Sequence, residues 1–148
     1  MVDILIGLGL AAVTVGSARL AGFDRDSAFY PTILAVIALL YVLFGVMDAR
    51  VGVIVSEGAV ALVFVALAVA GFKRSVWWLV AGYAIHGVWD LVHDAVITNN
   101  GVPVWWPHFC IAYDGAIAAY LALRARKPAA YSPPVQAHPR SGAPGVQT

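Results

Sequence analysis

The sequence predicts an all-α integral membrane protein: a bundle of five transmembrane helices with the N-terminus outside and the C-terminus in the cytoplasm. Its composition, its five apolar runs and its distribution of basic residues each support this fold class. Hydrophobic residues make up 61% of the 148 residues, charged residues make up 11%, and the mean hydropathy is +0.84. A soluble domain would carry roughly a quarter charged residues. We therefore expect a multi-pass protein of the cell membrane.

The five predicted helices are separated by charged residues or by turn-forming residues. They lie at residues 4–22, 32–47, 51–72, 76–97 and 108–123. Asp3 is the only charge before the first run, which therefore lacks the positive segment of a signal peptide and is expected to be retained. Pro31 suits the first turn of the second helix. Asn-Asn-Gly and two prolines interrupt the chain between the fourth and fifth helices.

The chain divides into one transmembrane domain, residues 1–127, and a tail, residues 128–148. The tail is rich in Pro, Ala, Ser and Gly and has no hydrophobic period, so we expect it to be disordered. The single cysteine, Cys110, excludes an intramolecular disulfide and a multi-cysteine zinc framework. A net charge of +1, without a basic patch interleaved with aromatic residues, predicts no nucleic-acid partner.

The basic residues predict the orientation. If the C-terminus is cytoplasmic, eight of the nine Lys and Arg residues lie on the inner side and only Arg50 lies outside. Such an asymmetry is typical of the positive-inside rule. The eight inner residues are Arg19, Arg25, Lys73, Arg74, Arg124, Arg126, Lys127 and Arg140.

The fourth helix carries His86, Asp90, His93 and Asp94 within an otherwise apolar span. At 100° per residue, these side chains share an arc of roughly 100°. Each ionisable group in a bilayer costs about 2.5–3.5 kcal/mol, so the face predicts a functional site.

Acidic residues on two other helices lie at the same depth. Glu57 on the third helix, Asp90 on the fourth and Asp114 on the fifth all fall roughly 8–10 Å below the outer surface, at 1.5 Å per residue. We therefore expect one polar pocket that also contains His86, with His108 at its mouth.

A divalent transition metal fits this set of side chains. Imidazole and carboxylate together suit zinc, iron or manganese. His86, Asp90 and His93, at i, i+4 and i+7 of one helix, are the predicted ligands, joined by Asp114 or Glu57. Because His86 and His93 lie about 10 Å apart along the helix axis, a two-ion site or a smaller ligand set is the alternative.

Without a metal, the same pocket predicts acid–base catalysis, with Glu57, Asp90, Asp114 and His93 as the catalytic residues. Buried carboxylates have raised pKa values and can protonate a lipid-soluble alkene or epoxide. In helix number and intramembrane acids, the chain resembles the five-helix isomerases of the emopamil-binding type and the small membrane terpene cyclases. No motif of these families aligns with the chain, so no residue roles follow. More generally, it resembles small bacterial multi-pass membrane proteins.

Structural roles are the alternative for individual residues. Glu57 can cap or snorkel, His93 and Asp94 can be wetted by headgroups, and the His86–Asp90 pair can join two helices. Three functions therefore stay open: an outward-facing membrane isomerase, cyclase or hydrolase; a small transporter, proton pathway or metal-handling protein; and a structural or accessory subunit. The expected partners are the bilayer and a lipid-soluble small molecule or metal ion, with a homo-oligomer or membrane complex left open.

Overall fold

The computed structural model describes residues 1–126. This part of the chain is all-helical, without strands. The predicted tail, together with Lys127 and Arg140, lies outside the described residues. The elements are α1 (Val2–Ala21), the short 3-10 helix η1 (Phe23–Arg25), α2 (Phe29–Asp48), α3 (Val51–Lys73), α4 (Val76–Val96) and α5 (Trp106–Ala125).

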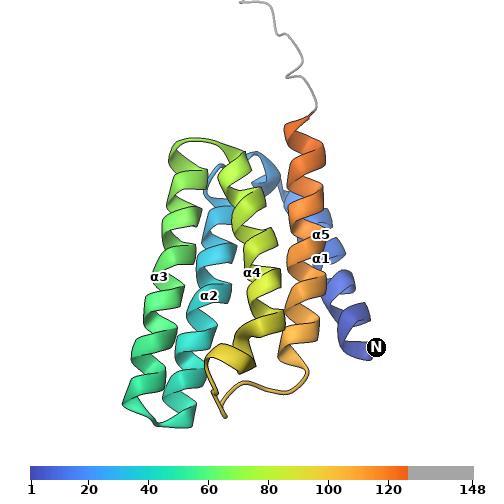
Figure 1. Ribbon diagram of the computed structural model, residues 1–148. Helices are drawn as coiled ribbons and strands as arrows, with labels where there is room; N and C mark the ends of the chain where they lie inside the picture. Colours follow the sequence, from blue (N-terminus) through green and yellow to red (C-terminus); the bar gives the residue numbers. More distant parts are fainter. Residues whose placement is uncertain (127–148) are drawn as a thin grey trace, which may run out of the picture.

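The five α-helices run side by side as one bundle (Figure 1). Helix α2 packs mainly against α3, and α4 packs mainly against α5. The two pairs are joined because α4 also contacts α3 and α2. Helix α1 packs on the far side of α5, so the first and last α-helices of the described residues are neighbours.

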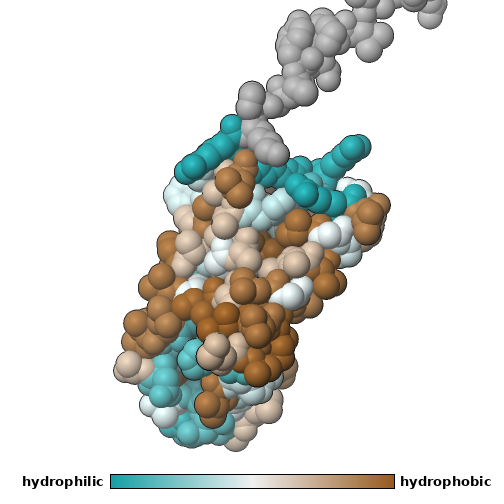
Figure 2. Space-filling model, turned by 90° about the vertical axis from the view of Figure 1, so that its right-hand side faces the viewer, coloured by the Kyte–Doolittle hydropathy of each residue, from teal (hydrophilic) through white to brown (hydrophobic). Residues whose placement is uncertain are grey.

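Three helices, α1, α2 and α3, are long and apolar enough to cross a membrane. Helices α4 and α5 have similar lengths, 21 and 20 residues, but carry the ionisable residues that lower their hydropathy. On the face shown in Figure 2, hydrophobic side chains cover the middle of the bundle and hydrophilic side chains gather at its two ends. This face therefore has the apolar middle and polar ends that suit helices long enough to cross a membrane.

Local sequence determines where the helices end. Gly22 ends α1 in the left-handed conformation, with φ 84°, which favours glycine. Ser75 caps α4 by accepting a hydrogen bond from the backbone N–H of Trp77. Helices α1, α2 and α5 each begin two or three residues before the expected range. For α2 and α5 the reason is that Pro31 and Pro107 lie inside the first turn. Backbone N–H groups have no intrahelical acceptor there, so the missing N–H of proline costs no helical hydrogen bond.

The apolar core lies toward the end of the bundle where α1, α3 and α5 end. Leu34, Tyr83 and Ile117 are completely buried there. The Tyr83 hydroxyl donates a hydrogen bond to the backbone oxygen of Tyr30 at 2.8 Å, so this buried polar group is satisfied. Six of the seven basic residues in the described part of the chain lie at this end, which we call the basic end.

Asp24 in η1 joins several elements at the basic end. Its carboxylate accepts hydrogen bonds from Tyr120 at 2.6 Å and Tyr30 at 3.0 Å, and it pairs with Arg124 at 2.8 Å. Partial burial favours a raised pKa for this carboxyl. The two tyrosine hydrogen bonds and the charge of Arg124 outweigh burial and hold its pKa below the ordinary value. Asp24 therefore stays ionised at neutral pH.

The contact between α1 and α5 depends on Gly7. A Cβ atom at Gly7 would lie 2.3 Å from the backbone oxygen of Phe109, so the two helices would have to separate. We expect Gly7→Ala to destabilise the protein by about 1–3 kcal/mol, the usual cost of overpacking. Gly9→Ala is the matched control, because nothing lies within 4 Å of a Cβ there. Thermal unfolding in detergent measures both, and equal unfolding temperatures would contradict this packing.

Candidate metal centre

The predicted site residues meet in the half of the bundle away from the basic end. On α4, His86, Asp90 and His93 are at most 3% exposed because the i, i+4, i+7 spacing directs them inward. Glu57 on α3 and Asp114 on α5 are completely buried. Small residues allow this close packing: Ala61 lies one turn after Glu57 on the same buried stripe of α3.

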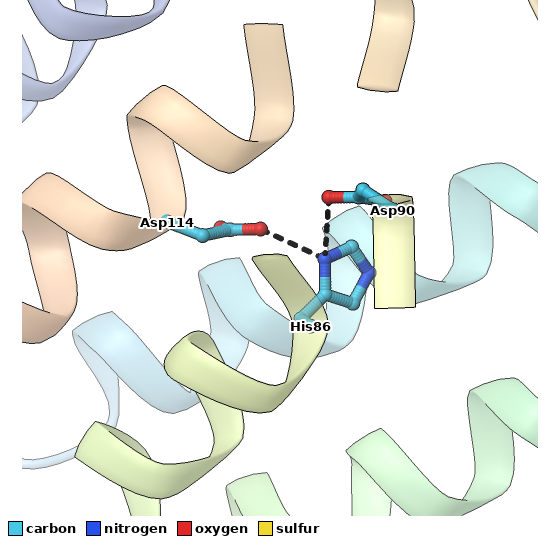
Figure 3. Close-up of side chains that lie close together, drawn as sticks. All are labelled: His86, Asp90 and Asp114. Carbon is cyan, nitrogen blue, oxygen red and sulfur yellow. Dashed lines mark hydrogen bonds and ion pairs between the residues drawn. The ribbon is translucent and has the colours of Figure 1, made fainter. Parts of the chain in front are cut away.

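His86 lies between two carboxylates that come from two helices (Figure 3). Its Nδ1 atom is 2.8 Å from Oδ2 of Asp114 on α5 and 3.4 Å from Oδ2 of Asp90 on α4. The first contact is a hydrogen bond, and the second is a longer ion-pair contact. We call His86, Asp90 and Asp114 the His86 centre.

The His86 centre could hold a metal ion. Each of its three residues offers one donor atom, and these atoms lie within 4.8 Å of one another. In the described residues, Nε2 of His86, Oδ2 of Asp90 and Oδ1 of Asp114 are buried without a hydrogen-bond partner. Buried polar atoms normally have partners, so this centre has spare coordinating capacity.

His93 belongs to a second pair and not to the His86 centre. Its Nε2 atom is 2.8 Å from Oε1 of Glu57. Asn99, in the segment after α4, donates a second hydrogen bond to the same Glu57 oxygen, also at 2.8 Å. The expected joint ligand set of His86, Asp90 and His93 is therefore divided, because seven residues of helix separate the two imidazoles by about 10 Å along the axis.

Tyr41 on α2 lies between the two groups. Its hydroxyl donates a 2.5 Å hydrogen bond to Oδ1 of Asp90. Its ring centroid is 4.5 Å from that of His93 and 6.0 Å from that of His86. One tyrosine therefore contacts both imidazoles and fixes one oxygen of Asp90.

Tyr41 and Asn99 were not among the site residues predicted from the sequence. A signal for Tyr41 exists, because a phenol inside an apolar helix needs a hydrogen-bond partner. Asn99 stands out less, since Asn-Asn-Gly first indicates a turn. Its side chain is nevertheless buried. Its Oδ1 atom accepts a hydrogen bond from the backbone N–H of Gly101 at 3.1 Å.

Asp94 and His108 lie at the periphery. Both are exposed, so Asp94 is not part of the buried face that was expected to hold four ionisable residues. They line a cavity of about 330 Å³ beside the loop between α4 and α5. Asp90 and His93 line the same cavity. The cavity therefore extends from the exposed residues Asp94 and His108 to the His86 centre, at Asp90, and to the His93–Glu57 pair, at His93.

No protein-family model, curated protein or solved structure matches this chain. Its function is therefore inferred from the residues and geometry of the His86 centre and its surroundings.

Proposed function

We propose that this chain is a five-span membrane enzyme whose His86 centre binds one divalent transition metal and acts on a lipid-soluble substrate. The observation that carries the proposal is the position of the His86 imidazole between two buried carboxylates, at 2.8 and 3.4 Å. One imidazole and two carboxylates form a donor set that suits zinc, iron or manganese.

Charge balance favours a cation in this position. Two carboxyl groups, those of Asp90 and Asp114, share this buried site with a single imidazole, that of His86. The Arg ion pairs of residues 1–126 lie elsewhere, at Asp48 and Asp24. A divalent cation would balance both carboxylates while His86 stays neutral, and so would offset the cost of burying them.

The surrounding residues support a reaction at this centre. When bound, the metal supplies a Lewis acid that polarises an oxygen of the substrate. Tyr41 holds the second oxygen of Asp90, which orients that carboxylate toward His86. The cavity of about 330 Å³ reaches the centre at Asp90, and its lining is divided between polar residues, such as His93 and Asn99, and apolar residues, such as Val102 and Val104. Such a lining suits an apolar molecule with one polar reacting group.

Acid–base catalysis without a metal is the second candidate. The Tyr41–Asp90 and His93–Glu57 hydrogen bonds favour it, because each joins groups that can exchange a proton. In this candidate, proton transfer to and from the substrate isomerises or cyclises it. The proton donors and acceptors would be Glu57, Asp90, Asp114 and His93.

A path through the bundle is less favoured. One turn from His86 and Asp114 toward the basic end lie Tyr83 and Ile117, and Leu34 is buried with them. This apolar layer separates the His86 centre from Asp24. It argues for a reaction site over a transporter or proton pathway.

We further propose that all five helices span the membrane, with the His86 centre toward the outside. The lengths of α4 and α5 and the six basic residues at one end support this topology. In a Cys110→Ala background, Val104→Cys should react with an impermeant maleimide on intact cells. Arg126→Cys should react only after permeabilisation. The opposite labelling pattern would reverse the orientation.

The test of the metal proposal is the metal content of protein purified without chelator. Elemental mass spectrometry should find about one zinc, iron or manganese ion per chain, as expected for a single centre. Removal by a chelator should lower the thermal unfolding temperature, because the ion stabilises only the folded state. Protein that is metal-free as isolated, and that no added metal stabilises, would favour the acid–base candidate.

A further inference from the structure

A second cavity, of about 500 Å³, lies at the basic end of the bundle, far from the His86 centre. It is bounded by η1, by the turn between α3 and α4, and by the end of α5. Four basic side chains line it: Arg25, Lys73, Arg74 and Arg124.

This cavity carries a surplus of positive charge. Asp24 and Asp26 are its two acidic residues. Asp24 pairs with Arg124, and Asp26 accepts a hydrogen bond from the backbone N–H of Ala28. Arg25, Lys73 and Arg74 are exposed, and no ion pair within residues 1–126 involves them. Helix α4 also begins here, which adds its positive N-terminal dipole. The cavity is therefore suited to an anion.

An apolar groove of about 230 Å³ adjoins this cavity between α2 and α3. Pro31 and Phe72 line both spaces. The groove is formed largely by small or apolar side chains, among them Ala35, Ala68 and Val69. From Phe72 to Val65, at its far end on α3, it extends about 10 Å along the helix axis.

We infer that the cavity and the groove together bind one anionic phospholipid. Its phosphate headgroup contacts Arg25, Lys73 and Arg74, and one acyl chain lies in the groove beside Ala35 and Ala68. A free phosphate would use only the cavity. A neutral lipid would gain little from the positive charge of the cavity. Because the two spaces adjoin at Pro31 and Phe72, an amphiphile with a negative headgroup uses both. This inference requires α2 and α3 to lie in a membrane, but does not depend on a metal at the His86 centre.

Native mass spectrometry of the full chain in detergent tests the inference. The probes are phosphatidylglycerol and phosphatidylcholine with identical acyl chains. We expect phosphatidylglycerol to bind at least about tenfold more tightly. Each basic residue near a membrane surface contributes about fivefold to affinity for anionic lipid, so Lys73→Gln with Arg74→Gln should weaken phosphatidylglycerol binding about 30-fold. Arg126→Gln is the matched control, because Arg126 lies at the same end but does not line the cavity.

A second variant tests the groove. Ala35→Phe should fill it and weaken the binding of phosphatidylglycerol. Leu43→Phe, at an exposed position of α2 outside the groove, should not. Thermal unfolding and metal content of all variants should match the wild type, which separates this test from that of the metal centre. Equal binding of the two lipids would overturn the inference. Full competition by glycerol phosphate, with no effect of Ala35→Phe, would assign the cavity to a soluble anion and would also overturn it.

Discussion

His86→Ala is expected to reduce the metal content from about one ion per chain to roughly a tenth or less, because loss of a ligand exceeds the 10- to 100-fold effect of an outer-shell change. Asp114→Asn should have a similar effect, since it removes the negative charge with almost no change in volume. Elemental mass spectrometry after dialysis against a fixed, low metal concentration measures both variants.

Two other histidines provide matched controls. His108 is exposed and lines the 330 Å³ cavity, so the His108→Ala variant should have the metal content of the wild type. His93→Ala should also keep it, because His93 pairs with Glu57 and lies outside the His86 centre. If His93→Ala lost the metal as fully as His86→Ala, the ligand set would include both imidazoles. If every variant kept the metal, the ion would bind elsewhere.

Glu57→Ala is expected to destabilise the protein by about 3–5 kcal/mol, the cost of removing one partner of a buried ion pair. The substitution leaves His93 Nε2 and the Asn99 amide without their shared acceptor. For a chain of this size, the unfolding temperature should fall by about 10 °C. Thermal unfolding in detergent, followed by circular dichroism, measures this change.

Glu57→Gln separates charge from hydrogen bonding. Its side-chain oxygen can still accept from His93 or Asn99, so it should cost clearly less than Glu57→Ala. Ser56→Ala, at an exposed neighbour on α3, should leave the unfolding temperature within error. Both Glu57 variants should retain the metal. An unfolding temperature unchanged in Glu57→Ala would mean that this pair contributes nothing to stability.

Helix periodicity and matched depth predicted part of the site. The inward face of α4 is visible in the spacing of His86, Asp90 and His93, and equal depth brings Glu57 and Asp114 to the same level. The three apolar helices are likewise evident from composition. These features depend on residues that are close in the chain, or on the number of residues between a side chain and the end of its helix.

The pairing of side chains could not be predicted from the sequence. Which imidazole meets which carboxylate depends on the rotation of α3 and α5 about their axes, which depth does not determine. The sequence therefore did not separate the His93–Glu57 pair from the His86 centre. Tyr41 was not predicted as a site residue, because its contact with Asp90 depends on the rotation of α2 and joins residues 49 positions apart in the chain.

The packing of α1 against α5 has a consequence for biogenesis. Among the helices of residues 1–126, α1 is synthesised first, yet its main partner, α5, is synthesised after the other four. The same late helix supplies Asp114 to His86. During synthesis, α1 therefore lacks its main partner while α2, α3 and α4 are made. The contacts of α5 with α1 and α4, and the hydrogen bond between Asp114 and His86, can form only after these four helices have been synthesised.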